Sequence, residues 1–258
     1  MKPILNRRNF VGLTAGAVAG TLVQSTIAAS PAAKTSLRAI AFDAFPIFDP
    51  RPVFALGEEL FPGKGGQLSN AWRARQFEYT WLRTIAGRYT DFWQVTEDAL
   101  IFAARNLKLH LDRPRRGRLM NAYLNLKPWP DVPHTLNALK EAGIRLGLLS
   151  NFTQPMLAAN VKNSGLDGVF EQILSTDRVQ QFKPAPRAYQ MAANAFGLTQ
   201  SDITFAAFAG WDASGAKWFG FPTVWVNRLN APAEELSVIP DLTCQDMKGL
   251  TAFMLSRR

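Results

Sequence analysis

The chain has 258 residues, 47% hydrophobic and 19% charged, which is the composition of a globular protein rather than a disordered one. Its net charge of +9 favours small anionic ligands, and the absence of basic stretches interleaved with aromatic residues argues against nucleic-acid binding. With Cys244 the only cysteine and His110 and His134 the only histidines, an internal disulfide framework and a Cys- or His-based metal site are excluded.

The first 33 residues have the pattern of an export signal. Lys2, Arg7 and Arg8 precede a charge-free run over residues 9–33, and the paired arginines before two hydrophobic residues resemble the twin-arginine signal. An uncleaved membrane anchor is the alternative, but glycine, threonine, serine and glutamine interrupt the run. We expect cleavage, so that the mature protein is periplasmic or secreted without stable membrane insertion.

Four short apolar runs without helical period predict buried strands at residues 37–42, 143–149, 203–208 and 222–226. Amphipathic stretches at residues 132–142, 155–164 and 184–196 separate them and predict helices. This alternation predicts an α/β fold with a Rossmann-like parallel sheet, formed by residues 34–50 and 128–258. Ligands collect beyond the carboxyl ends of such strands, where Asp43, Ser150, Asn151 and Asp212 fall.

A long insert over residues 51–127 follows the first predicted strand. Residues 72–86, 92–107 and 116–126 carry helical spacing, so we expect an all-helical insert. Because it leaves the sheet next to Asp43, it is predicted to cover the strand ends as a cap.

Six sequence pieces in order resemble the haloacid dehalogenase superfamily, specifically its type II 2-haloacid dehalogenases. They include Ala41-Phe42-Asp43, Trp72-Arg73, Leu149-Ser150-Asn151, Lys183-Pro184 and Trp211-Asp212. The matching pieces run from about residue 37 to residue 227, nearly the whole mature chain. The resemblance implies metal-independent hydrolysis of short 2-haloalkanoic acids to 2-hydroxy acids, with no cofactor.

The resemblance also implies a role for each site residue. Asp43 would attack the carbon that bears the halide and form an ester, since a dehydrated carboxylate held in line can displace halide. Lys183 would keep Asp43 ionised, and Asp212 would hold Lys183 and activate the hydrolytic water. The remaining roles are the halide cradle (Arg73 and Asn151), the substrate carboxylate site (Ser150), support of the lysine (Tyr189) and the apolar wall (Phe45, Phe77, Phe92 and Trp211).

Phosphatases of the same superfamily are the nearest alternative. They need a second aspartate two residues after the nucleophile and a magnesium ion held by carboxylates, but Phe45 occupies that position and Asp212 has no acidic neighbour. Phosphoryl transfer is therefore not expected.

The chain departs from the dehalogenases at three supports of the nucleophile. The usual Tyr-Gly-Thr-Leu is one residue shorter here and contains Pro46, and Ala207 and Ala209 replace a serine and an asparagine. A competent dehalogenase is the first expectation; a hydrolase for another activated acid, or an impaired protein that binds small carboxylates, are the alternatives. The aromatic-rich cap is compatible with a homodimer.

Overall fold

The computed structural model describes residues 36–257, so the predicted export signal over residues 1–33 lies outside the described part of the chain. Six strands form one sheet in the order β5-β4-β1-β6-β7-β8, and every neighbouring pair is parallel. The strands are β1 (Ala39–Phe42), β4 (Arg145–Ser150), β5 (Gln172–Ser175), β6 (Ile203–Ala207), β7 (Thr223–Val226) and β8 (Leu242–Cys244). The predicted α/β fold with a parallel sheet is confirmed.

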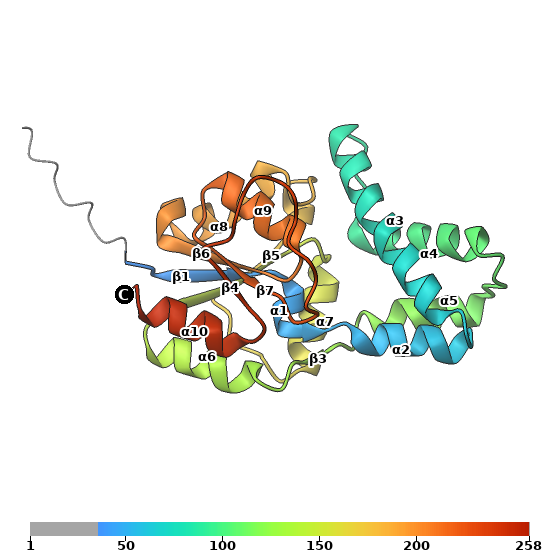
Figure 1. Ribbon diagram of the computed structural model, residues 1–258, viewed down its shortest axis with the longest axis horizontal. Helices are drawn as coiled ribbons and strands as arrows, with labels where there is room; N and C mark the ends of the chain where they lie inside the picture. The colour runs from blue at the N-terminus through green and yellow to red at the C-terminus, as the bar shows by residue number, and fades with distance from the viewer. Residues whose placement is uncertain (1–35, 258) are drawn as a thin grey trace, which may run out of the picture. The chain divides into compact units, whose positions relative to one another are not determined.

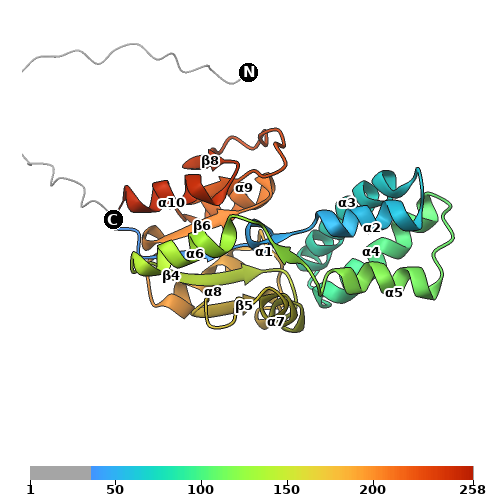
Figure 2. The ribbon, with the colours of Figure 1, turned by 90° about the horizontal axis from the view of Figure 1, so that it is seen from below.

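Helices cover both faces of the sheet because side chains alternate along each strand (Figures 1 and 2). Ile40 and Phe42 belong to the apolar cluster that includes residues of α6 (Val132–Glu141), α7 (Gln154–Asn163) and α10 (Met247–Leu255). Ala39 and Ala41 belong to the cluster on the opposite face, with α8 (Pro186–Phe196) and α9 (Gly210–Phe219). Two short 3-10 helices, η1 (Thr176–Arg178) and η2 (Gln200–Asp202), precede α8 and β6.

The strand register brings the ends of β1, β4 and β6 to one edge of the sheet. Phe42 pairs with Leu148 of β4 and with Ala206 of β6. The short helix α1 (Ala44–Ile47) begins directly after Asp43. Residues that follow these three strands therefore lie close together in space.

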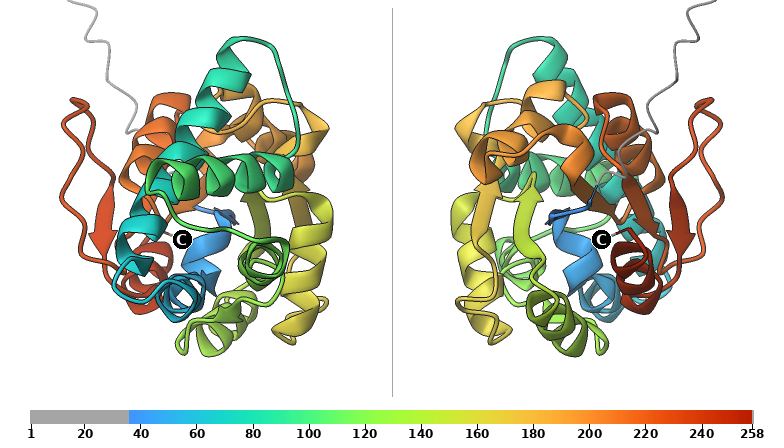
Figure 3. Two further views of the ribbon diagram at one scale, coloured as in Figure 1. Left: turned by 90° about the vertical axis from the view of Figure 1, so that its right-hand side faces the viewer. Right: turned by 90° about the vertical axis from the view of Figure 1, so that its left-hand side faces the viewer.

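Four helices, called here the helical segment, lie between β2 (Phe48–Asp49) and β3 (Lys127–Pro128), which pair antiparallel. They are α2 (Arg51–Leu60), α3 (Gly65–Ile85), α4 (Phe92–Asn106) and α5 (Arg113–Ala122). They lie beyond the carboxyl ends of the sheet strands (Figures 1 and 3). None of the helices within residues 36–257 is both long and apolar enough to cross a membrane.

Two helices of this segment differ from their predicted bounds. Helix α5 begins at Arg113 because the Asp112 side chain accepts a hydrogen bond from the Arg115 N–H, and it ends at Ala122 instead of residue 126. Helix α3 begins at Gly65, seven residues before the predicted start at residue 72. Gly65 packs against Glu58, where a Cβ would lie 2.2 Å from backbone atoms, so only glycine fits this crossing of α2 and α3.

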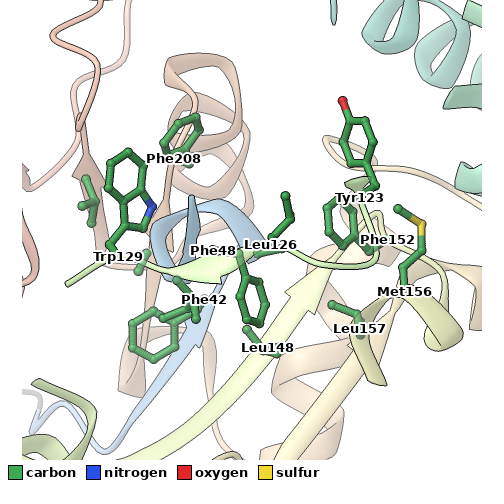
Figure 4. Packing of buried hydrophobic residues seen from close by; sticks show 14 of the residues in the cluster. Phe42, Phe48, Tyr123, Leu126, Trp129, Leu148, Phe152, Met156, Leu157 and Phe208 are labelled. Atoms are coloured by element: carbon green, nitrogen blue, oxygen red, sulfur yellow. The ribbon is translucent and has the colours of Figure 1, made fainter. Parts of the chain in front are cut away.

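One apolar cluster continues from the sheet into the helical segment (Figure 4). The Phe152 ring, just after β4, lies 5.6 Å from Phe92 of α4 and 6.2 Å from Tyr123. Each such buried ring contributes about 1.5–3 kcal/mol relative to exposure. The packing that stabilises the fold thus also holds the helical segment over the strand ends.

Candidate active site

Asp43 lies at the carboxyl end of β1, the central strand of the site. Its N–H donates to Ala206 O at 3.0 Å, and its side chain caps α1 by accepting the Phe45 N–H at 3.3 Å. The other carboxylate oxygen accepts Lys183 Nζ at 2.8 Å. The residue is 9% exposed, so its carboxylate is largely shielded from water.

Lys183 lies between two carboxylates. Its Nζ is 2.8 Å from Asp43 Oδ1 and 2.6 Å from Asp212 Oδ2, and its side chain is 1% exposed. Burial lowers the pKa of Lys183, but attraction to Asp212 and Asp43 outweighs it, and the pKa lies above its usual value. Lys183 is therefore held in its charged form beside Asp43.

Asp212, in the first turn of α9, is the buried partner of this lysine. Burial raises its pKa to about 6 against the opposing pull of Lys183. Tyr189 Oη donates to Asp212 Oδ1 at 2.6 Å, and burial, followed by the charge of Asp212, holds the Tyr189 pKa well above its usual range. The phenol thus stays neutral and continues to donate its hydrogen bond to the Asp212 carboxylate.

Gly215 makes the contact between α8 and α9 possible. A Cβ at this position would lie 2.6 Å from both Tyr189 Oη and Pro184 Cβ. The bare backbone lets the tyrosine reach Asp212, so the glycine in the Trp-Asp-Ala-Ser-Gly motif has a steric reason.

A cavity between the helical segment and the strand ends contains Asp43. Its wall includes ten of the eleven predicted site residues: Asp43, Phe45, Arg73, Phe77, Phe92, Ser150, Asn151, Lys183, Trp211 and Asp212. Tyr189 does not line it and lies behind Asp212. The structure thus brings together residues that are up to 169 positions apart (212 − 43).

Arg73 and Asn151 both line this cavity. Asn151 Oδ1 accepts the Lys183 N–H at 3.0 Å and the Thr176 hydroxyl at 3.4 Å, which leaves the Nδ2 group to donate. Arg73 forms no ion pair among residues 36–257, and its guanidinium lies 5.4 Å from the Phe54 ring. A cation and an amide donor are thus available to an anion.

Aromatic rings form the opposite wall. Phe77 meets Trp211 edge to face at 5.2 Å, and Phe45 meets Phe152 in the same way at 5.2 Å. Trp211 Nε1 is buried, with no hydrogen-bond partner in the described part of the chain. Such a wall of rings makes this part of the cavity apolar.

Several wall residues were missed by the sequence analysis: Pro50, Phe54, Gln76, Tyr123, Phe152 and Phe208. Phe152 follows the predicted strand at residues 143–149 and Phe208 ends the one at 203–208, so their position was a usable signal. Tyr123 carried no such signal, because the predicted helix ran through it. Burial raises the pKa of Tyr123 to about 12, so it presents a neutral hydroxyl.

Within residues 36–257, no group of three or more His, Cys, Asp or Glu side chains could hold a metal ion. The acidic pair at the site is already bridged by Lys183, which occupies the place between the two carboxylates. The donor set therefore suits an organic anion better than a hard divalent cation.

A family model of haloacid dehalogenase-like hydrolases matches residues 18–220. The chain belongs to this family. It is 45% identical to an (S)-2-haloacid dehalogenase of Pseudomonas sp. (strain YL), over 83% of this chain and 93% of that protein. Among solved structures, an L-2-haloacid dehalogenase matches with a TM-score of 0.84 and 44% identity, over 86% of this chain and all of the other.

A second solved structure bears on the chemistry. The L-2-haloacid dehalogenase of Xanthobacter autotrophicus, with chloropropionic acid covalently bound, matches at 32% identity and a TM-score of 0.78, over 85% of this chain and 98% of that one. That protein therefore binds chloropropionic acid covalently.

The departures of this haloacid dehalogenase-like hydrolase concern the support of Asp43. Ala207 is fully buried and Ala209 lines the cavity, so neither supplies a hydroxyl or amide. Within the described chain, the Asp43 carboxylate accepts hydrogen bonds from Lys183 Nζ and the Phe45 N–H. Its orientation depends on these two donors.

Proposed function

We propose that this hydrolase converts short 2-haloalkanoic acids to 2-hydroxy acids through an ester on Asp43. The observation that carries this function is the buried Asp43–Lys183–Asp212 chain opening into a cavity with an arginine that has no carboxylate partner. The relatives named (S)-2-haloacid dehalogenase support it. The reaction breaks a carbon–halide bond.

In the first step, one carboxylate oxygen of Asp43 attacks the halide-bearing carbon from the side opposite the halide. The oxygen–carbon bond forms as the carbon–halide bond breaks, and halide leaves with the bonding electron pair. Arg73 and the Asn151 amide receive the halide, and Ser150 binds the substrate carboxylate. Charge is thereby stabilised where it develops.

In the second step, water attacks the ester and releases the 2-hydroxy acid. Asp212 takes the proton from this water, since its pKa of about 6 makes it a base near neutral pH. Lys183 stabilises the carboxylate of Asp43 as it reforms. The net products are the hydroxy acid, halide and one proton.

The cavity restricts the substrate to a short chain. The cavity volume is about 40 Å³. This small volume supports a substrate with a short carbon chain.

The test is halide release from chloroacetate and from each enantiomer of 2-chloropropionate, with a chelator present. Wild type should release halide, and Asp43→Asn should lose at least about 10³-fold in rate. Rapid quench and mass spectrometry should find an ester adduct on the peptide containing Asp43. Absence of both halide and adduct in wild type would refute the function, and loss of activity with chelator would favour a metal-dependent phosphatase.

We also propose the domain division and the location of the protein. Residues 51–127 act as the cap over a core of residues 34–50 and 128–258, and residues 1–33 direct twin-arginine export to the periplasm before cleavage. The basic start and charge-free run support export. Changing Arg7 and Arg8 to lysine should retain the full-length chain in the cytoplasm, detected by fractionation and N-terminal sequencing.

A homodimer is proposed for the mature enzyme. Leu82 and Ile85, near the carboxyl end of α3, are 60% and 85% exposed, as expected of side chains that a second copy covers. Sedimentation should give twice the monomer mass, and Ile85→Glu should restore the monomer.

A further inference from the structure

The backbone carbonyls of α1 are bound by groups outside that helix. Trp129 Nε1 donates to Phe45 O at 2.9 Å, and the Trp129 N–H donates to Ile47 O at 3.0 Å. Between them, Arg228 donates to Pro46 O through Nε at 3.3 Å and Nη2 at 3.1 Å. Three consecutive carbonyls that follow the nucleophile are therefore held by two residues, and Figure 4 shows Trp129 beside this part of the chain.

Arg228 is built into the structure rather than extended into solvent. Its side chain is 6% exposed, and its guanidinium lies 4.6 Å from the Trp129 ring. It also pairs with Asp131, with Nη2 2.9 Å from Oδ1 and Nη1 3.2 Å from Oδ2. Asp131 in turn accepts the Met247 N–H at 2.8 Å, which anchors the pair to α10.

Helix α1 needs such external support. It is a single turn of four residues, and a turn this short is not stable alone. Pro46 supplies no N–H to it. Yet this turn sets the direction of the Phe45 N–H, one of the two donors to the Asp43 carboxylate.

We propose that Arg228, acting with Trp129, is a positioning residue that aims the Asp43 carboxylate by fixing the carbonyls of α1. The inference rests on the proposed function, because it assigns the aim of the proposed nucleophile. Loss of the clamp lets α1 tilt, and misplacement of a reacting atom by about 1 Å reduces rate by about 10²-fold. Ground-state binding through Arg73 and Ser150 stays intact.

Arg228→Gln and Arg228→Lys test this, with Arg145→Gln as the matched control. Arg145 also pairs with a carboxylate, Glu171, donates to a backbone carbonyl, Phe196 O at 2.8 Å, and lies 5.1 Å from an aromatic ring, that of Phe196. It begins β4, at the end of the sheet away from the cavity. Arg228→Gln should lower kcat about 10- to 100-fold with KM within about twofold.

Arg228→Lys keeps one donor for Pro46 O and should recover part of that kcat, whereas Arg145→Gln should lower the melting temperature without lowering kcat in the folded protein. Equal kcat values for Arg228→Gln and Arg145→Gln, after correction for folded fraction, would overturn the inference. So would a change in KM alone.

Hydrogen exchange of the amides of residues 43–45, 47 and 48 gives a readout independent of turnover. Arg228→Gln should exchange them at least tenfold faster than wild type, and Arg145→Gln should leave them unchanged. If wild type released no halide, the proposed function would fail, and equal exchange in the two variants would still overturn the clamp on its own.

Discussion

The ammonium of Lys183 lies 2.6 Å from the carboxylate of Asp212, and both side chains are at most 2% exposed. Removing either partner of such a pair destabilises the fold, since it leaves an unpaired buried charge. The Asp43 carboxylate shares the same ammonium, so the charge state of Asp212 bears directly on the nucleophile.

The pKa of Asp212 predicts an acid limit to activity. Asp212 must be ionised to hold Lys183 and to accept a proton from water, and its pKa is about 6. The rate of ester hydrolysis should therefore fall tenfold per pH unit below about 6. Single-turnover decay of the ester adduct between pH 4.5 and 8 measures this, and a flat profile would exclude Asp212 as the base.

The raised pKa of Asp212 also predicts that the free energy of unfolding falls as pH rises, whereas activity rises over the same pH range. The folded-state pKa of about 6 lies above the ordinary value of 3.8, so ionisation of Asp212 disfavours folding. Its penalty is absent below pH 3.8, grows as pH rises and is complete above about 6. The free energy of unfolding of Asp212→Asn, relative to wild type, should thus rise from pH 4 to pH 7 in urea titrations.

Tyr189→Phe should move the acid limit of activity to higher pH. Without the phenol, Asp212 Oδ1 loses a donor that stabilises its charged form, so its pKa rises further and the activity limit shifts to higher pH. The free energy of unfolding should fall by about 1–3 kcal/mol. Tyr79→Phe is the control, since Tyr79 lies on α3 with its ring against Phe102 of α4, and it should leave the pH profile in place.

Arg73→Lys should weaken halide departure. A lysine presents a single point charge where the guanidinium offers a planar fork, and loss of such charge stabilisation lowers kcat by about 10²-fold. Arg75→Lys on the same helix, where Arg75 pairs with Glu78 at 2.8 Å, is the matched control. Similar kcat values for both variants would remove Arg73 from the halide site.

Ester hydrolysis should limit turnover, because Ala207 and Ala209 supply no polar support to that step. Rapid mixing with 2-chloropropionate should give a burst of halide close to one equivalent per active site, followed by a slower steady rate. Ala209→Asn, at the cavity wall, should raise the steady rate and reduce the burst. A linear trace without a burst would place the slow step at displacement.

The sequence predicted the elements whose signals are local. The predicted runs at residues 37–42, 143–149, 203–208 and 222–226 correspond to β1, β4, β6 and β7, since a continuous apolar run followed by polar residues is typical of a buried parallel strand. Strands β5 and β8 were missed. They are short edge strands with polar residues such as Gln172 and Thr243, and only pairing with a neighbour makes them strands.

The predicted site includes Asp43, Ser150 and Asn151 at strand ends, but it lacks Phe152 and Phe208 beside them and the wall residues that packing supplies. Asp43 and Asn151 follow from position along the chain. The support of α1 by Arg228 could not be predicted from chain position. Arg228 lies 185 positions after Asp43 (228 − 43) and approaches α1 only in the folded chain. A hydrogen bond to the backbone carbonyl of a residue far away in sequence does not depend on the type of that residue, so no sequence pattern indicates it.

The antiparallel pair β2–β3 places Asp49 next to Lys127, so the chain leaves for the helical segment and returns at adjoining points. Arg73, Phe77 and Phe92 come from that excursion, whereas Asp43, Lys183 and Asp212 come from the sheet and its loops. The proposed nucleophile and its lysine and aspartate partners are thus encoded outside the stretch of the gene that supplies Arg73 and part of the cavity wall. Exchange of residues 50–126 between relatives is the shortest route to a new halide or chain-length preference with the displacement chemistry intact.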